Sequence, residues 1–231
     1  MTINGIDLST FSATLLSKQL TNHDVIQVYD WLDGASGPVF SRSEQQFKDI
    51  SLTILIETSS ESETESQFSA LIRAIQACTV EFDDLPKRFD CHFKGKVEPK
   101  YLTARAWLVE VDLLCHKTYL PEVILTANEV SSKIVTSLGS QSSPCLITVT
   151  PTTDIAEFVI LGFSSEIWIQ NLEANKVHTI DGYLYRYLKD GANDIANYYA
   201  FTWPVLPIGT TNLIFSHSTT SITIQYHPIL N

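Results

Sequence analysis

The hydrophobic pattern changes from strand to helix between residues 47 and 78. In the segment FKDISLTILIE, large apolar residues occupy every second position: Ile50, Leu52, Ile54 and Ile56. Side chains of a strand alternate between its two faces, so this spacing predicts a strand with one buried face. A second apolar set follows at positions i, i+3, i+4 and i+7: Phe68, Leu71, Ile72 and Ile75. That spacing predicts an amphipathic helix with one buried stripe.

The predicted helix has a clear start signal. Ser60 and Glu63 have the spacing of a capping box, in which serine and glutamate side chains satisfy free amides at the helix start. Glu65 adds another carboxylate near the positive end of the helix dipole. We expect the helix to run from about Ser60 to Cys78. Strand patterns resume after it, at residues 80–95 and 102–116.

Helical periodicity is missing from the chain after Pro144. The pattern there consists of short apolar runs separated by turn residues: CLITVTP, EFVILGF, EIWIQNL, KVHTIDG, YLYRYLKDG, TNLIFSH and SITIQYHP. Many short strands at this spacing are typical of a β-sandwich or barrel. A small, polar segment at 126–143 separates the two halves. We therefore predict a mainly β protein with two domains, a strand-rich domain with one packed helix at 1–127 and a β-sandwich at 128–231.

The stretch HTIDGYLYRYLKDGAND, residues 178–194, contains both acids and aromatic residues. Asp181-Gly182 and Asp190-Gly191 are dipeptides typical of hairpin turns, because glycine accepts the positive φ that tight turns need. The acids are therefore interpreted as turn residues rather than as a metal or sugar site. Between the turns, a strand period places Tyr183, Tyr185 and Tyr187 on one face.

Charge and cysteine content exclude some classes of protein. The formal net charge is −11, from 26 acidic and 15 basic residues, and the basic residues form no cluster longer than Lys87-Arg88. Proteins that grip nucleic acid normally present a basic face, so sequence-specific DNA binding is not expected. The four cysteines lie far apart without a CxxC pair, which predicts reduced thiols. The first residues lack the basic and apolar regions of a signal peptide, and no apolar run is long enough to predict a membrane span.

Motifs for catalysis and metal binding are weak. The sequence has no G-x-S-x-G, Walker A, G-x-G-x-x-G or H-E-x-x-H pattern, so we expect neither enzymatic activity nor a cofactor. The dipeptides Cys91-His92 and Cys115-His116 resemble metal ligands, but adjacent strand residues point to opposite faces. Buried thiols with outward histidines are the favoured interpretation. Glu81, Asp83 and Asp84 are interpreted as solvated acids at a turn, in preference to a general acid–base pair.

Aromatic residues are frequent in the second half, with Trp168, Tyr183, Tyr185, Tyr187 and Trp203. Aromatic rings on a sheet face stack on sugars in lectin-like sandwiches, and they also fill sandwich cores. The core interpretation is favoured for the tyrosines. An exposed aromatic platform is the alternative, with Trp168 and Tyr185 as candidate carbohydrate-binding residues.

The order of these segments resembles the distal tail proteins of siphophages that infect Gram-positive hosts. The matching pieces are INGID at residues 3–7, WLDG at 31–34, the strand, helix and strand that lead to EFDDL at 81–85, IDG at 180–182, DGAN at 190–193, PVLPIG at 204–209 running into NLI at 212–214, and the final ITIQYHP. No single motif is specific, and the ordered set carries the resemblance.

The resemblance implies a tail-tube-like N-terminal domain, a β-sandwich or barrel that assembles into a hexameric ring, and a galectin-like C-terminal sandwich. It implies a virion hub at the tail tip that joins the tail tube protein to the tip protein, lets DNA pass and often carries receptor-binding proteins. Assembly is expected in the cytoplasm of the host bacterium. An acidic wall suits a DNA conduit, since like charges repel phosphate. Recognition of host cell-wall saccharide by the C-terminal domain is the alternative function.

Overall fold

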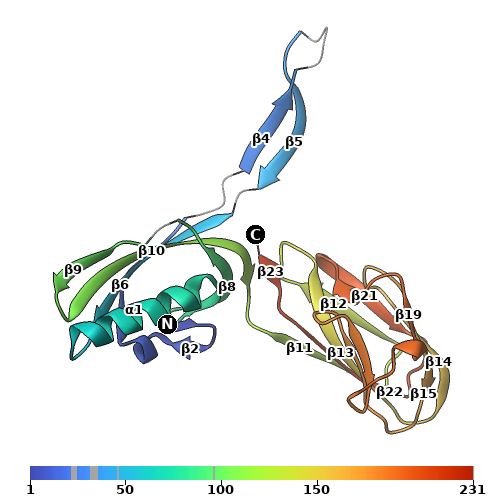
Figure 1. Cartoon of the computed structure of the whole chain (residues 1–231). Helices are drawn as coiled ribbons and strands as arrows, with labels where there is room; N and C mark the ends of the chain where they lie inside the picture. Colours follow the sequence, from blue (N-terminus) through green and yellow to red (C-terminus); the bar gives the residue numbers. More distant parts are fainter. Residues whose placement is uncertain (22–24, 32–35, 46, 96, 231) are drawn as a thin grey trace. The chain divides into compact units, whose positions relative to one another are not determined.

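The computed structural model describes all residues except 22–24, 32–35, 46, 96 and 231. Part of the WLDG tract, residues 32–34, therefore lies outside the described residues. The chain forms two compact units, Met1–Thr118 (unit 1) and Tyr119–Leu230 (unit 2). The mainly β fold with one α-helix is confirmed (Figure 1). Within the described residues, no helix is long and apolar enough to cross a membrane.

The units divide the chain earlier than the boundary that the sequence predicts after residue 127. Strand β11 (Val123–Asn128) pairs along its whole length with β22 (Thr220–Tyr226), so it belongs to unit 2. The polar segment that we interpreted as a boundary contains β12 (Ser132–Ser137), which pairs with β21 (Gly209–Phe215). Its polar composition comes from a strand with exposed alternate positions, not from a linker.

Unit 1 is built on one antiparallel-rich sheet that carries the helix on one face. Its elements are β1 (Thr2–Ile3), β2 (Ile6–Asp7), the 3₁₀ helix η1 (Leu8–Phe11), β3 (Ala13–Leu20), β4 (Val25–Asp30), β5 (Val39–Gln45), β6 (Lys48–Glu57), α1 (Glu61–Ile75), β7 (Ala77–Phe82), β8 (Leu85–Phe93), β9 (Pro99–Thr103) and β10 (Ala106–Tyr119). The sheet order is β2-β1-β7-β8-β10-β6-β3, and β9 also pairs with β10. The resemblance to distal tail proteins implies a sandwich or barrel here. The described strands form an open path, whose end strands β2 and β3 do not pair with each other.

The core of unit 1 lies between this sheet and α1. The alternating residues of β6 predicted to be buried, Ile50 to Ile56, are fully buried. Leu71 and Ile75 of α1 are buried against them, and Phe68 and Ile72 pack at the rim of the same core. The helix ends before the predicted Cys78, because residue 77 already pairs with β8 as part of β7. Two different periods in one sequence segment thus produce one sheet–helix core.

Carboxylates dominate the sheet face opposite α1. On β6 and β10, the residues that alternate with the buried set carry Glu57, Glu110 and Asp112, all exposed. The same face carries Asp49 of β6, Glu81 of β7 and Asp90 of β8, together with the basic residues Arg88 of β8, Lys94 just after β8 and Lys100 of β9. Lys94 pairs with Asp49 at 2.9 Å, which leaves the acids in excess. We call this surface the acidic face.

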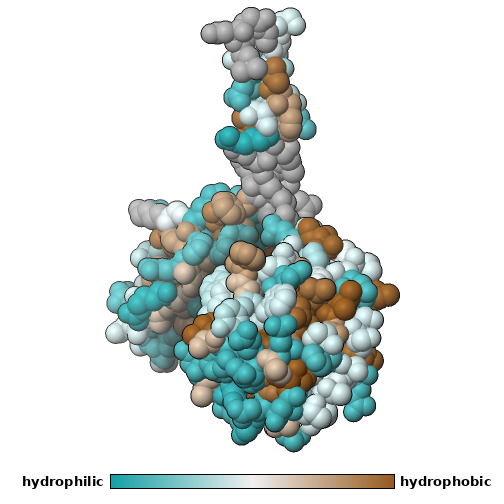
Figure 2. All heavy atoms as spheres, turned by 90° about the vertical axis from the view of Figure 1, so that its right-hand side faces the viewer, coloured by the Kyte–Doolittle hydropathy of each residue, from teal (hydrophilic) through white to brown (hydrophobic). Residues whose placement is uncertain are grey.

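The hairpin of β4 and β5 pairs with no other described strand. It exposes several large apolar side chains, including Tyr29 and Phe40, whose rings meet edge to face at 5.9 Å. Figure 2 shows hydrophobic residues on the surface of this hairpin, at the top of the view. A two-stranded hairpin alone is marginally stable in water, and exposed apolar surface of this kind is typical of association sites.

The start of α1 confirms the predicted cap and permits a direct test. Ser60 Oγ accepts a hydrogen bond from the Glu63 amide at 3.3 Å, while the Glu63 carboxylate accepts from the amide and hydroxyl of Ser59. Ser60→Ala is expected to lower the free energy of unfolding of unit 1 by about 1 kcal/mol, the usual cost of a lost N-cap. Urea denaturation measures it. Ser62→Ala, exposed in the first turn, is the matched control and should have little effect; equal losses in the two variants would contradict this role of the cap.

The cysteines and histidines occupy the positions expected of core thiols and outward rings. Cys78, Cys91 and Cys115 are buried free thiols of unit 1. Burial raises the pKa of Cys78 to about 11, which keeps the thiol protonated. On the opposite face, the rings of His92 and His116 stack at 4.8 Å. In the described part of the chain, no three His, Cys, Asp or Glu side chains form a group that could hold a metal ion.

The acids near Pro86 also lie where the sequence predicts. Asp83 and Asp84 form the turn between β7 and β8, and both are exposed. Asp84 accepts a hydrogen bond from Lys18 of β3, whose ammonium also lies 4.4 Å from the ring centre of Phe82. These contacts hold the edge strand β3 against the turn, which is a structural role.

Unit 2 is a β-sandwich. Besides β11, β12, β21 and β22, its strands are β13 (Ser143–Pro151), β14 (Ile155–Leu161), β15 (Ile167–Leu172), β16 (His178–Asp181), β17 (Arg186–Lys189), β18 (Ala192–Asn193), β19 (Tyr198–Ala200), β20 (Val205–Leu206) and β23 (Ile229–Leu230), with a 3₁₀ helix η2 (Ile195–Asn197). One sheet has the order β11-β22-β13-β16-β17-β18, and the other has the order β12-β21-β14-β15-β19. Inward residues of both sheets share one core, such as Ile147 and Ile224 with Phe158 and Ile169.

Candidate binding pocket in unit 2

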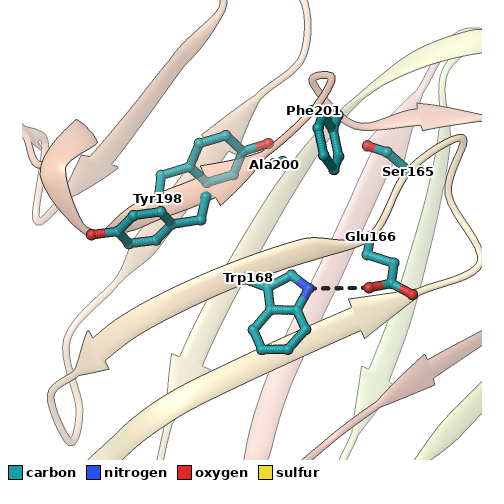
Figure 3. A pocket seen from close by; sticks show the side chains of 7 residues that line it. Ser165, Glu166, Trp168, Tyr198, Ala200 and Phe201 are labelled. Carbon is teal, nitrogen blue, oxygen red and sulfur yellow. Dashed lines mark hydrogen bonds between the residues drawn. The ribbon is translucent and has the colours of Figure 1, made fainter.

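A pocket of about 720 Å³ lies where β15 meets the edge strand β19. Antiparallel pairing sets Trp168 directly opposite Tyr199 and Ile167 opposite Ala200. The turn before β15 and the bend after β19 complete the pocket (Figure 3). Its lining residues are Ser165, Glu166, Trp168, Tyr198, Tyr199, Ala200 and Phe201. Two segments about thirty residues apart in sequence therefore form one concave, largely aromatic surface.

Trp168 lies on the outer face of its sheet, because its neighbours Ile167 and Ile169 are both buried. Its side chain is 39% exposed. The indole Nε1 donates a hydrogen bond to Glu166 Oε2 at 3.2 Å, the contact drawn in Figure 3. Binding the ring nitrogen to a carboxylate fixes the orientation of the indole and leaves a ring face available to the pocket.

A column of stacked rings supports the pocket from inside the sandwich. Tyr198 stacks on Trp203 at 4.8 Å and on Tyr187 at 5.7 Å, and Tyr187 stacks on His178 at 6.0 Å. Tyr187 and His178 are fully buried and share a hydrogen bond of 2.6 Å between Oη and Nδ1. Burial raises the pKa of Tyr187 and of Tyr198. Tyr198, which lines the pocket, is thus packed against a stack of aromatic rings in the sandwich.

Tyr185, the second carbohydrate candidate, does not line this pocket. The predicted tyrosine stripe is wrong, because residues 182–185 form the turn between β16 and β17 and only Tyr187 lies in a strand. Tyr185 takes a left-handed φ of +54° and is 68% exposed, while Tyr187 is buried. Its ring contacts Trp203 at 6.2 Å, at the outer end of the aromatic column.

Asp181 explains this turn. Its Oδ1 accepts hydrogen bonds from the amides of Tyr183 and Leu184, both at 3.0 Å, and its Oδ2 accepts from Arg186 Nε at 3.1 Å. The hairpin predicted at Asp181-Gly182 therefore exists, with a longer turn than a two-residue one. The second predicted turn, Asp190-Gly191, is confirmed as a two-residue turn in which both residues have positive φ.

The buried His178 makes the stability of unit 2 depend on pH. Burial, and then the nearby Lys189, lower its pKa. The unfolded chain, with a histidine pKa of about 6.5, therefore takes up a proton before the folded one does. The contribution of His178 to the stability of unit 2 is fully present above that pH. It falls as the pH drops from about 6.5 toward the folded pKa, by no more than about 1.4 kcal/mol per pH unit.

Denaturant unfolding of unit 2 between about pH 5 and pH 7 tests this expectation. His178→Gln should flatten the pH dependence whatever it does to absolute stability. His217→Gln, which alters an exposed histidine of the same unit, should retain the wild-type slope. A slope that survives in the His178→Gln protein would assign the titration to another group.

The lining of the pocket is mainly aromatic and carries little charge. Its lining residues include one carboxylate, Glu166, and no Lys, Arg or His. The hydroxyl of Ser165 is hydrogen-bonded to that of Thr202 at 2.8 Å, and the Glu166 carboxylate accepts a hydrogen bond from Trp168. Sequence reasoning found Trp168. It missed Tyr199 and Phe201, because only the pairing of β19 with β15 brings these residues to the same surface.

Comparison with known proteins places the fold. No protein-family model and no curated protein matches the chain. Solved structures do match, and the fold that they define is that of phage tail hub and baseplate proteins. One of them is SPP1 Dit, described as a paradigm of the hub adsorption apparatus in phages that infect Gram-positive bacteria. It matches with a TM-score of 0.75 over 98% of this chain and 97% of that chain, at 13% identity.

Two structures of the phage P2 baseplate in its activated conformation, with Ca and with Sr, also match. Their TM-scores are 0.53 and 0.52, at 9% and 10% identity, over 95% of this chain and 92% of each of those chains. The predicted resemblance to distal tail proteins is therefore confirmed at the level of the fold. The match spans both units, so it does not rest on a common sandwich alone.

Proposed function

We propose that this chain is a structural protein of a siphophage tail, in which copies of it form a hexameric ring hub at the distal end of the tail tube. The observation that carries the proposal is the match to SPP1 Dit over nearly the full length of both chains. The ring joins the tail tube protein to the tip protein and carries receptor-binding proteins. Its role is to hold partners, and no catalytic step is part of it. It acts at the virion tail tip after assembly in the host cytoplasm.

Exposed apolar residues of unit 1 support self-association. Large side chains that are exposed in the single chain include Leu16 of β3, Phe40 of β5 and Tyr101 of β9. β3 is also an edge strand of the main sheet, whose described pairing is with β6. Edge strands and apolar surface of this kind are used by assemblies to join subunits. Closed rotational symmetry satisfies such a surface on every copy.

The position of the acidic face supports the proposal that DNA passes through the ring. Exposed carboxylates such as Glu57, Glu110 and Asp112 lie on one side of the sheet, and α1 packs on the other. A wall of negative charge repels phosphate and prevents the duplex from adhering as it slides. We therefore place the acidic face on the lumen of the proposed ring.

Electron microscopy of the purified protein tests the ring, with mass measurement by light scattering. Sixfold rings in either the free protein or isolated tails are the expected result, with labelled copies at the tail tip. Co-purification with the tail tube and tip proteins tests the two proposed junctions. A protein that stays monomeric at high concentration and is absent from purified tails would refute the proposal.

A further inference from the structure

We propose that the pocket between β15 and β19 is a binding site for a saccharide without negative charge. The proposal is independent of the ring, because every lining residue belongs to unit 2 of one chain. The volume of about 720 Å³ lies within the range of roughly 300–1,000 Å³ that small-ligand sites occupy. A protein partner would instead need a flat interface of about 800 Å² on each side.

The exposed rings provide the stacking surface. Trp168 and Tyr199 are cross-strand partners on the outer face, and both are partly exposed. Phe201, just beyond the end of β19, is fully exposed. In Figure 3, Phe201 and Trp168 lie on different sides of the pocket. A pyranose ring has C–H-rich faces that pack on aromatic rings, so a sugar unit held there would contact more than one ring.

Polar groups for sugar hydroxyls lie beside these rings. Glu166 uses Oε2 to accept from Trp168 Nε1, so its carboxylate is held at the pocket with further acceptor capacity. β19 is the last strand of its sheet and pairs with β15 among the described strands. One side of an edge strand carries backbone N–H and C=O groups without a strand partner, and these groups match the donors and acceptors of sugar hydroxyls.

The charge of the lining selects among saccharides. Glu166 is the charged residue of the lining set, which contains no Lys, Arg or His. A phosphate-bearing glycan or polyol would bring like charge to a carboxylate with no basic partner, which is unfavourable. Neutral hexoses and N-acetylhexosamines avoid that cost. The buried ring column behind Tyr198 keeps the pocket in shape, so little ordering is lost on binding.

The experiment uses the full-length protein with defined probes. Lactose, maltotriose and N,N′-diacetylchitobiose are titrated by calorimetry, and ligand-observed NMR reports contact with aromatic protons. Polyglycerol phosphate is the anionic probe. We expect at least one neutral probe to bind with a Kd of about 1 mM or tighter, with polyglycerol phosphate neither binding nor competing.

Three variants assign the binding to this pocket. Phe201→Ala removes a fully exposed ring, so it should leave the fold unchanged and weaken binding roughly tenfold or more. Glu166→Gln keeps an acceptor oxygen and should allow polyglycerol phosphate to bind better than it does to wild type. Ile134→Ala truncates another exposed apolar side chain on the opposite edge strand of the same sheet and should bind like wild type.

Three results would overturn the site. They are no binding of any neutral probe at about 10 mM, stronger binding of polyglycerol phosphate than of the sugars, or Phe201→Ala binding as wild type does. A protein that binds sugar but never forms rings would leave this site standing and refute the proposed hub function. Rings without sugar binding would do the reverse.

Discussion

Replacing Gly162 by alanine is expected to lower the free energy of unfolding of unit 2 by about 3 kcal/mol or more. Gly162 follows β14 with a φ of +102°, a conformation that L-residues with a side chain rarely adopt. A Cβ at this position would lie 2.5 Å from the carbonyl oxygen of Asn212 and 3.1 Å from the Cα of Leu213. Both atoms belong to the backbone of β21, and Leu213 is in the core, so neither can move aside cheaply.

Gly191→Ala is the matched control because it isolates the backbone contribution. Gly191 also has a positive φ, +80°, but a Cβ there meets nothing within 4 Å. It should cost about 1 kcal/mol, the usual strain of a left-handed residue. Denaturant unfolding followed by tryptophan fluorescence measures both variants, since Trp168 and Trp203 lie in unit 2. Equal losses would mean that the contact with β21 relaxes and that φ alone matters.

The regular elements of this fold are encoded by local patterns, which is why sequence reasoning located them. The period of two across Ile50–Ile56 and the helical period from Phe68 to Ile75 each bury one face, and the structure places both in one core. The cap at Ser60 and the Asp190-Gly191 turn depend on short-range interactions that a few neighbouring residues specify. The helix end was less predictable, because pairing of residue 77 with β8 stops it.

The errors arose where side-chain hydrogen bonds compete with a period. The spacing of Tyr183, Tyr185 and Tyr187 is that of a strand. Asp181 nevertheless accepts hydrogen bonds from two backbone amides, and these bonds hold residues 182–185 in a turn. Gly182 does not have a positive φ. It is required because a Cβ there would lie 2.5 Å from the Pro204 carbonyl oxygen, a contact between segments distant in sequence. No local sequence pattern predicts such a close contact between two backbone segments.

The candidate pocket was half predictable for the same reason. Trp168 stands between two inward isoleucines, so its outward position follows from the strand period. Phe201 carries no sequence signal that distinguishes an exposed ring from a core ring. The register that sets Trp168 opposite Tyr199 pairs two strands about thirty residues apart, so no local pattern specifies it. A surface formed by two strands that are distant in sequence therefore requires the structure.

Reversing charge on the acidic face is expected to slow DNA release from virions by about tenfold or more at low salt. The variant Glu57→Lys with Glu110→Lys changes two exposed carboxylates on adjacent strands of this face. Each substitution changes the charge by +2, so each copy gains +4, and a ring multiplies that change. Lysines on the lumen would attract phosphates and release counterions, which converts a repelling wall into a binding one.

A double variant with the same charge change provides the control. Glu65→Lys with Glu157→Lys places one lysine on α1, which packs on the other face of the unit 1 sheet, and one on β14 of unit 2, and both positions are exposed. Virions assembled with each protein are triggered in vitro, and DNA release is followed by dye fluorescence at increasing salt. The defect of the acidic-face variant should shrink as salt screens the charges, while the control releases DNA at the wild-type rate. Equal rates of DNA release by both variants at low salt would show that the acidic face does not line the DNA path. Lysines that line the path would bind the phosphates of the passing DNA.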